Sequence, residues 1–349
     1  MKCTIQNIAD HLGLSRNTVS KALKNSSEVS ENTRNLVIKT ASKLGYKKAT
    51  FATPVIPASE TGSNGTILFL TRTYASDSEF WTTVLRGIES ILSNANYHLA
   101  ISIMSDSDLK QLNFPQTISD SSIKGIILVE ICDKVVCDAL SQFNLPIVSV
   151  DMPNVPFEEL NGIDVVTMES KKNLKKIINQ LIEKGAESFG FVGDLYSPNV
   201  SRGFQERYNA LSECLAEHQL PLNQKNCLLH QTPEDFRNFQ TTVNNLQAMI
   251  SLPDVFICGN DWTAIQLIYA LQFLGFQIPK DICVVGFDNI PAASRISPSL
   301  TTISTPQKYL GIAAARQILE RIQHPNCPHV FCQYETELII RNSTNITSF

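Results

Sequence analysis

A short polar segment near the N-terminus carries side chains that can read the edges of nucleic-acid bases. Residues 16–21 run Arg-Asn-Thr-Val-Ser-Lys. Arg and Lys donate hydrogen bonds to guanine, Asn pairs with adenine, and Ser or Thr can contact bases or phosphates. On a helix, Val19 turns inward, which leaves Arg16, Asn17 and Lys21 on the outer face. The pattern favours a base-reading helix over its alternative, a plain solvated helix face.

Three short helices are expected to position this segment within a head of residues 1–46. Thr4 and Ser15 are suited to cap the first two helices, and the second helix would span residues 16–23. Ser30 would cap a third helix. Two short helices joined by a glycine-containing turn, with a third to close the core, form a helix-turn-helix module.

The first 50 residues are basic, whereas the rest of the chain is acidic. These residues hold nine Lys and Arg against three Asp and Glu, a net charge of +6, and the rest carries −10. A basic head on an acidic body is typical of a small nucleic-acid-binding module joined to a domain with another task. Because the basic charge coincides with the predicted base-reading helix, we favour DNA as the partner.

From residue 66 onward, short apolar β-rich runs alternate with helical stretches. This alternation predicts an α/β fold of two doubly wound parallel-sheet subdomains, each covered by helices on both faces. Ligands in such folds bind at the carboxyl ends of strands, so we expect a small ligand in the cleft between the subdomains. The strand candidates are residues 67–70, 99–103, 126–129, 147–150, 189–192, 227–229, 255–258 and 282–285, and the helix candidates are 81–93, 172–183, 205–217, 263–274 and 310–322.

Several functional classes find no support in the sequence. No run of about 18 apolar residues could cross a membrane, and no apolar signal segment follows Met1. The nine cysteines are scattered, which is typical of reduced thiols in a cytoplasmic protein. The six histidines show no metal-ligand spacing, and no nucleophile or phosphate-binding motif occurs. We therefore expect a cytoplasmic, non-enzymatic protein that uses no metal or cofactor.

Two motifs in the head point to a known family. Residues 4–9 (Thr-Ile-Gln-Asn-Ile-Ala) and 14–23 (Leu-Ser-Arg-Asn-Thr-Val-Ser-Lys-Ala-Leu) resemble the DNA-binding head of the LacI family of bacterial transcription regulators. The resemblance implies that Arg16 and Asn17 read bases in the major groove, with Lys21 one turn further on. Ser15, Thr18, Asn25 and Thr33 match positions that touch phosphates, and the full set of DNA-contact candidates is Thr4, Ser15, Arg16, Asn17, Thr18, Lys21, Asn25 and Thr33.

The segment after the head departs from the family pattern. In the family, Ala-Arg-x-Leu folds into a hinge helix on DNA, and its Leu enters the minor groove. Here Thr53 stands in place of the Arg and Val55 in place of the Leu. Pro54 and Pro57 each disfavour a continuous helix and restrict the residue before them. We therefore predict no ordinary hinge helix within the linker, residues 47–65.

The resemblance continues through the body to about Thr344, with segments such as Ile278–Asn289. It implies the family's effector-binding domain, which is similar to periplasmic sugar-binding proteins, over residues 66–349. The chain would then cross between its two subdomains near residues 162, 291 and 323. Subdomain one would comprise residues 66–162 and 292–323, and subdomain two residues 163–291 and 324–344.

Six residues match positions around the ligand of that effector domain. An aromatic ring after the first strand would stack on the ligand, while an arginine, an amide and carboxylates would bind its hydroxyl groups. The alternatives are a core role for the rings, a helix-capping role for Asp261 and a surface ion pair for Arg207. The effector-contact candidates are Phe80, Trp81, Arg207, Asn260, Asp261 and Asp288.

Together these features predict a sequence-specific, DNA-binding transcription regulator, a repressor controlled by a small ligand of carbohydrate type. A homodimer on a double-stranded DNA operator is expected, because one head makes few base contacts and the family pairs its effector domains. Two alternatives stay open. One is a global regulator controlled mainly by a protein partner, and the other is a solute-binding protein with no role on DNA.

Overall fold

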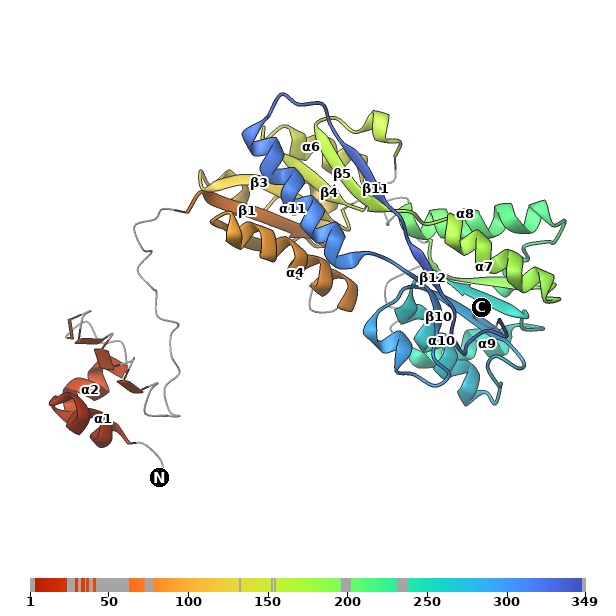
Figure 1. The fold of residues 1–349 in the computed structure, drawn as a ribbon, viewed down its shortest axis with the longest axis horizontal. Coiled ribbons are helices and arrows are strands. Elements are labelled where there is room, and N and C mark those ends of the chain that lie inside the picture. The colour runs from red at the N-terminus through yellow and green to blue at the C-terminus, as the bar shows by residue number, and fades with distance from the viewer. Residues whose placement is uncertain are drawn as a thin grey trace. The chain divides into compact units, whose positions relative to one another are not determined.

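The chain forms two compact units, Met1–Gly62 and Ser63–Phe349 (Figure 1). We describe both units from a computed structural model. The prediction for the linker, residues 47–65, falls almost wholly outside the residues that the structure describes. The described residues are 4–23, 29–30, 33–34, 36–37, 40–41, 63–72, 78–131, 133–151, 153, 155–195, 202–230 and 238–346.

The first unit contains the helix pair that the capping residues predict, α1 (Ile5–Leu12) and α2 (Arg16–Leu23). The Oγ1 atom of Thr4 accepts a hydrogen bond from the backbone of the first turn of α1, and a left-handed Gly13 ends that helix. Apolar side chains of both helices form a small buried core with part of the third helical segment. Leu36 of that segment is 50% exposed and lies outside this core.

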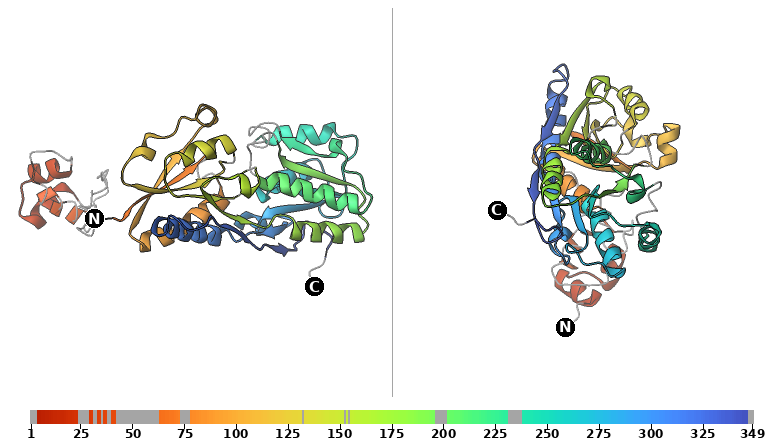
Figure 2. Two further views of the ribbon diagram at one scale, coloured as in Figure 1. Left: turned by 90° about the horizontal axis from the view of Figure 1, so that it is seen from above. Right: turned by 90° about the vertical axis from the view of Figure 1, so that its right-hand side faces the viewer.

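The second unit has two lobes, and the first lobe is built on a parallel sheet in the order β11-β5-β4-β3-β1-β2. Helices α4 and α11 cover one face of this sheet, and α5 and α6 cover the other (Figure 2). Its elements are β1 (Gly65–Thr71), α4 (Glu79–Asn94), β2 (Tyr97–Ile103), α5 (Asp106–Gln111), β3 (Ile123–Val129), α6 (Lys134–Ser141), β4 (Ile147–Val150), β5 (Ile163–Met168), α11 (Gln307–Gln323) and β11 (Phe331–Tyr334).

The second lobe repeats this layering on a sheet in the order β12-β10-β9-β8-β6-β7. Only β12 runs antiparallel among its described strand pairs, and α7 and α8 lie opposite α9 and α10 across the sheet. Its elements are α7 (Lys172–Glu183), β6 (Phe189–Asp194), α8 (Arg202–Glu217), β7 (Leu228–His230), α9 (Phe239–Ala248), β8 (Val255–Cys258), α10 (Asp261–Phe273), β9 (Cys283–Asp288), β10 (Thr301–Ser304) and β12 (Glu337–Ile339). None of the described helices is long and apolar enough to cross a membrane.

Each crossover between the lobes falls one strand later than expected. Strand β5 pairs with β4 of the first lobe and β10 with β9 of the second, although both were expected in the opposite subdomain. The reason is that a short apolar run reveals a strand but does not reveal which of two similar parallel sheets it joins. The observed crossovers lie between Met168 and Lys172, between Ser304 and Gln307, and between Tyr334 and Glu337.

The last part of the chain is fastened to the first lobe by a buried ion pair. Asp164 of β5 is fully buried, and its carboxylate accepts hydrogen bonds from Arg321 Nη2 at 2.7 Å and Nε at 3.0 Å. The backbone N–H of Val330 and the amide of Gln317 donate to the same carboxylate. Burial opposes ionisation of Asp164, but these donors together hold its pKa below its usual value. The pair therefore anchors α11 and the approach to β11.

Candidate functional site

The outer face of α2 is polar and open to solvent. Arg16 and Asn17 are exposed in its first turn, and Lys21, one turn further on, is half-buried. The Oγ atom of Ser15 accepts a hydrogen bond from the backbone N–H of Thr18 at 3.0 Å, which caps the helix. A capped helix N-terminus with exposed Arg and Asn side chains presents donors to both phosphates and base edges.

The remaining DNA-contact candidates lie at helix starts or outside the described residues. Thr4 is exposed at the N-terminus of α1, where its side chain is already engaged with Asn7. Thr33 lies at the start of the third helical segment, with its hydroxyl 2.8 Å from Ser30 Oγ. Asn25 falls outside the described residues.

In the second unit, three acidic residues mark the ends of buried strands. Glu130 follows β3, Asp151 follows β4, and Asp288 ends β9. All three have positive φ angles, of 58°, 75° and 114°. This conformation is costly for residues other than glycine and tends to persist at functional sites. Of these three residues, only Asp288 was predicted as a ligand contact, although an acidic residue at the end of an apolar run was a usable signal for Glu130 and Asp151 as well.

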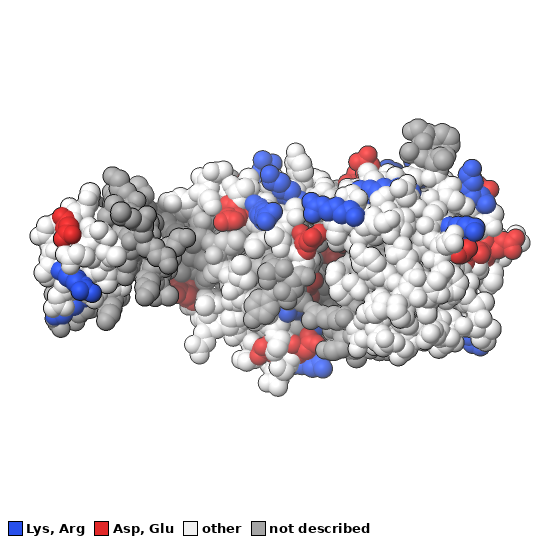
Figure 3. Space-filling view, turned by 90° about the horizontal axis from the view of Figure 1, so that it is seen from below, with Lys and Arg blue, Asp and Glu red and all other residues white. Residues whose placement is uncertain are grey.

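These strand ends face the junction between the lobes, because the chain crosses from one lobe to the other at the carboxyl ends of β5, β10 and β11. Strands β5 and β11 lead from the first lobe into the second within a few residues, and β10 leads back into α11. We call Trp81, Glu130, Asp151, Arg207 and Asp288 the interlobe site. The face drawn in Figure 3 is hollowed where the two lobes meet, with acidic and basic side chains at the edge.

Arg207 is the buried cation of the interlobe site. Only 4% of it is exposed, so the alternative of a surface ion pair is wrong. Its guanidinium lies 3.6 Å from the centre of the Phe287 ring, and its Nη1 donates to the carbonyl of Gly259 at 2.6 Å. Its Nε has no hydrogen-bond partner among the described residues. Arg207 thus keeps donor capacity for a ligand while packing holds its plane in place.

The carboxylates of Asp288 in the second lobe and Asp151 in the first lobe both act electrostatically on Arg207. Burial lowers the pKa of Arg207, and the negative charges of Asp288 and Asp151 oppose that change. Burial raises the pKa of Asp288 well above its usual value; Arg207 opposes this shift, whereas Asp261 and Asp151 add to it. The Asp288 side chain has no hydrogen-bond partner among the described residues. A guanidinium and carboxylates in this arrangement can each bind paired hydroxyl groups.

Asp261 is a structural residue and does not face this site. It is fully buried, and its two carboxylate oxygens accept from Thr302 Oγ1 at 2.5 Å and from the Ile290 N–H at 2.9 Å. Burial raises its pKa to about 7. A Cβ atom on Gly286 would lie 2.2 Å from Asp261 Oδ1, so that position requires glycine. The predicted effector contact for Asp261 is therefore wrong in this structure, because protein groups use both of its oxygens.

Asn260, the neighbour of Asp261, caps α10 instead. Its Oδ1 accepts from the backbone N–H of Thr263 at 2.9 Å and from the hydroxyl of the same residue at 2.7 Å. The capping role considered for Asp261 thus belongs to the residue before it. Asn260 is half-buried at the carboxyl end of β8, next to the Gly259 carbonyl that holds Arg207.

The two predicted stacking rings are both buried in the first lobe. Phe80 and Trp81 meet edge to face, with ring centres 4.7 Å apart, at the start of α4. The indole N–H of Trp81 donates to Glu130 Oε1 at 2.6 Å, which ties the ring to the carboxyl end of β3. Both rings therefore belong to the core of the first lobe, the alternative considered for them, and Trp81 is in addition hydrogen-bonded to Glu130 of the interlobe site.

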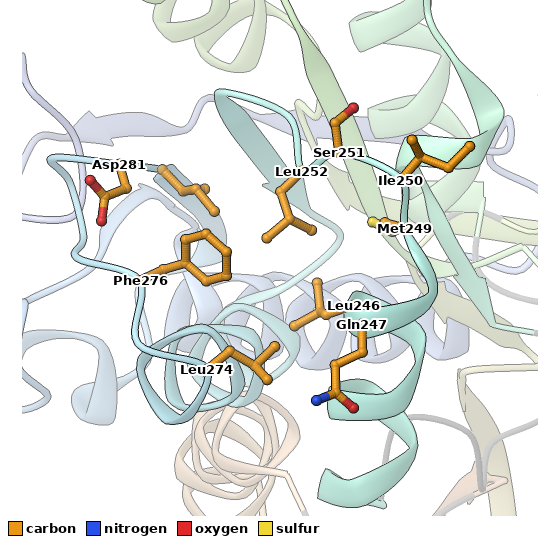
Figure 4. A pocket seen from close by; sticks show the side chains of 10 residues that line it. Leu246, Gln247, Met249, Ile250, Ser251, Leu252, Leu274, Phe276 and Asp281 are labelled. Carbon is orange, nitrogen blue, oxygen red and sulfur yellow. The ribbon is translucent and has the colours of Figure 1, made fainter.

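A separate hollow lies at the opposite end of the second lobe's strands (Figure 4). It has a volume of about 440 Å³ and lies between the ends of α9 and α10 and the loop before β9. Its lining is mostly aliphatic, and its one charged group, Asp281, accepts a hydrogen bond from the Gln277 N–H. Recognition of a polar ligand is therefore better provided by the interlobe site. Among the described residues, no group of His, Cys, Asp and Glu is arranged to hold a metal ion.

Models of known families match parts of both units. The model of the bacterial regulatory proteins of the lacI family matches residues 4–48, and the model of the periplasmic binding protein-like domain matches residues 178–344. The two matches fall on the helix-turn-helix head and on most of the second lobe with the final crossovers.

Relatives match along nearly the whole chain. The HTH-type transcriptional repressor PurR of Photobacterium profundum is 26% identical over 345 residues, which cover 97% of this chain and 98% of the relative. The ribose operon repressor of Haemophilus influenzae is 27% identical over 344 residues, with 97% and 98% covered. A solved complex of the transcriptional regulator CelR with cellobiose has a TM-score of 0.69 at 19% identity, with 98% of this chain and all of that chain covered.

A helix-turn-helix head joined to a two-lobed α/β unit of periplasmic-binding-protein type defines a DNA-binding transcription regulator. The predicted fold class is confirmed in both units. Within that class, the head matches the model of the lacI family of bacterial regulatory proteins over residues 4–48, as its motifs predict, and the relatives that match along nearly the whole chain are repressors.

Proposed function

We propose that this regulator represses transcription from a DNA operator, and that a small polyhydroxylated ligand at the interlobe site sets its affinity for that operator. The observation that carries the proposal is Arg207, buried on the Phe287 ring between carboxylates of both lobes. Two relatives support a carbohydrate as the ligand, since one is a ribose operon repressor and another was solved with cellobiose. A protein that acts by binding a DNA operator would be located in the cytoplasm and would have a binding role instead of an enzymatic one.

Ligand binding would act through the contacts that join the lobes. The backbone carbonyl of Asp288 accepts from Gln307 Nε2 at 2.6 Å and from Thr305 Oγ1 at 3.2 Å, and both donors lie at the crossover into α11. Arg202 of the second lobe donates to the carbonyl of Val155 in the first at 3.0 Å. A ligand that binds one lobe arrangement better shifts the population toward it. In a dimer, that shift would change the spacing of the two heads over the operator half-sites.

We further propose that the chain is a homodimer paired through an aromatic face on α9 and α10. Trp262, Tyr269 and Phe273 recur at helical spacing on α10 and are between 40% and 68% exposed. Phe239 of α9 extends the row, with its ring centre 5.8 Å from that of Phe273. Exposed aromatic rows of this kind mark protein–protein interfaces. A second copy fits best, because two identical half-sites on DNA call for two identical heads.

Titration calorimetry of the full chain against a panel of monosaccharides and disaccharides tests ligand control. We expect one sugar to bind once per chain, and Arg207→Ala to weaken that binding by about 100-fold because the variant removes the fixed donor. Arg295→Ala, which removes an exposed arginine, is the matched control and should bind as the wild type does. If no sugar binds, or if Arg207→Ala binds normally, the proposed ligand site is wrong.

A further inference from the structure

A second aromatic ring lies next to Arg207 at the interlobe site. The guanidinium carbon of Arg207 is 5.5 Å from the centre of the Phe204 ring and 3.6 Å from the centre of the Phe287 ring. Only 1% of Phe287 is exposed, so contacts within the protein already cover that ring. Phe204 stays partly exposed in the first turn of α8. Of the two rings beside Arg207, Phe204 is therefore the one that a ligand can touch.

Two glycines at the carboxyl ends of strands hold the Phe204 ring in place. Gly193 lies near the end of β6, and Gly259 directly follows β8. A Cβ atom on Gly259 would lie 2.1 Å from Cε1 of the ring, and one on Gly193 would lie 2.9 Å from Cδ1. The same edge of the ring thus packs on two backbone positions that only glycine allows. Since ligands of α/β folds bind at the carboxyl ends of strands, Phe204 lies on the ligand side of the second lobe.

Gly259 also connects the ring to the donors of Arg207. Its carbonyl oxygen accepts from Arg207 Nη1 at 2.6 Å. Another edge of the guanidinium carries Nε and Nη2, and no described residue accepts from either nitrogen. Two donors on one edge suit a pair of neighbouring hydroxyl groups. Phe204 and Arg207 are three residues apart on α8, so the ring and these donors share one face of the helix.

The rings that the sequence predicts for stacking are not available for it. Phe80 and Trp81 are 7% and 8% exposed and pack in the core of the first lobe. A sugar presents C–H groups as well as hydroxyl groups, and ligand sites combine aromatic or apolar walls with a few polar groups. Arg207 and the carboxylates provide the polar groups of the interlobe site, and Phe204 provides the aromatic wall.

We propose that the C–H face of the ligand's sugar ring stacks on Phe204 while the free edge of Arg207 donates to hydroxyl groups of the same sugar. The inference rests on the proposed function, because it names a further contact with the ligand of the same site. It moves the stacking role from the first lobe to the second, and from the start of α4 to the start of α8.

Titration calorimetry of the full chain against ribose, glucose, galactose, mannose and cellobiose tests the inference. A sugar that binds the wild type should bind Phe204→Ala about tenfold more weakly. Phe204→Leu should recover only part of that loss, because leucine is apolar but not planar. Gln205→Ala changes the exposed neighbour of Phe204 on α8 and is the matched control, which should bind as the wild type does. Urea denaturation of each variant verifies that it is folded.

A spectroscopic measurement separates contact with the ligand from a purely structural role of the ring. In saturation-transfer NMR with irradiation of aromatic protons, the C–H protons of the bound sugar should receive saturation from the wild type. That transfer should fall in Phe204→Leu at sugar concentrations that fill the site equally. Gln205→Ala should keep the transfer of the wild type.

The outcomes distinguish the stacking role from the proposed function. If a sugar binds the wild type and binds Phe204→Ala or Phe204→Leu equally tightly, the stacking role is wrong and the interlobe site remains. Unchanged saturation transfer in Phe204→Leu overturns it in the same way. Absence of binding by all five sugars contradicts carbohydrate control itself, and the proposed function fails together with the inference.

Discussion

The interlobe site depends on single residues in uncommon backbone conformations. Glu130, Asp151 and Asp288 leave their strands with positive φ, where most side chains are disfavoured. Family motifs in the sequence were sufficient to name Arg207 and Asp288. Asp151 was missed because its importance comes from its electrostatic influence on Arg207 of the other lobe, and the sequence alone does not show which strand ends lie near each other.

Asp261 and Asn260 are adjacent residues whose roles sequence matching could not tell apart. Both follow the same strand, and both carry side-chain oxygens that could cap the next helix or bind a ligand. The structure gives the cap to Asn260 and fully buries Asp261 beneath Gly286. That difference depends on the close approach of β9 to the start of α10, which the sequence spacing does not reveal.

Asp261 should make stability depend on pH in a defined direction. Its pKa is about 7 in the folded protein against 3.8 for a free carboxyl, so between about pH 4 and 7 the unfolded chain loses a proton that the folded chain keeps. The wild type should therefore lose stability as the pH rises through this window. Asp261→Asn cannot ionise, and its stability relative to the wild type should rise by roughly 4 kcal/mol across the window.

Urea denaturation at several pH values measures this difference. The variant also loses an acceptor for the Ile290 N–H, so it is expected to be less stable than the wild type at pH 4. The prediction concerns how the difference in unfolding free energy between the variant and the wild type changes with pH, and not the size of that difference at any one pH. A difference that stays constant from pH 4 to 7 would show that Asp261 does not titrate in this range in the folded protein.

Arg16 and Asn17 should carry much of the base selection by the head. The double variant Arg16→Ala with Asn17→Ala is expected to lose discrimination between operator and unrelated DNA by ~1–3 kcal/mol for each base contact removed. An operator can be obtained by selection from random DNA, and binding compared at fixed salt. Gln6→Ala, on the exposed face of α1, is the control and should keep its selectivity. Full selectivity in the double variant would mean that α2 is not the reader.

At the scale of elements, the alternation of apolar runs and helical stretches was enough to predict the α/β architecture. Each of the eight predicted strands corresponds to an observed strand. The missed strands are β5, β10, β11 and β12, and all four lie directly at crossovers. The partners of β11 and β12 are distant in sequence, and the exposed β11 also lacks the apolar character that marks a buried strand.

The Asp164–Arg321 pair should be among the most costly contacts to break in the first lobe. Asp164→Ala leaves Arg321 buried and without its carboxylate, and loss of one partner of a buried pair typically destabilises by roughly 3–5 kcal/mol. Chemical denaturation of the full chain measures the change. Asp106→Ala breaks the Arg72 ion pair, where Asp106 is 60% exposed, and should cost less than about 1 kcal/mol. Equal losses in the two variants would contradict the anchoring role of Asp164.

At the scale of the whole molecule, the aromatic face of α9 and α10 predicts how copies of the chain associate. Tyr269→Glu with Phe273→Glu places two charges within the row of rings and should convert the dimer to monomer. Sedimentation or light scattering gives the mass, and operator affinity should fall with dimerisation because two linked heads bind far more tightly than one.

A control separates this effect from a general loss of surface hydrophobicity. Val135→Glu places a charge at a residue of α6 that is 62% exposed in the first lobe, on a different helix. This variant should remain dimeric. If the double variant keeps the mass of the wild type, copies of the chain pair through another surface or remain monomers.

The three crossovers have a consequence for how the protein is made. The sheet of the first lobe begins at residue 65, but it is completed only by α11 and β11, which leave the ribosome after almost all of the second lobe. Helix α11 packs so closely on α4 that a Cβ on Gly311 would lie 2.0 Å from the Val84 carbonyl. During synthesis of the second lobe, the nascent first lobe therefore has an apolar face that α11 does not yet cover. This uncovered face makes the first lobe the part of the chain most exposed to aggregation and to capture by chaperones.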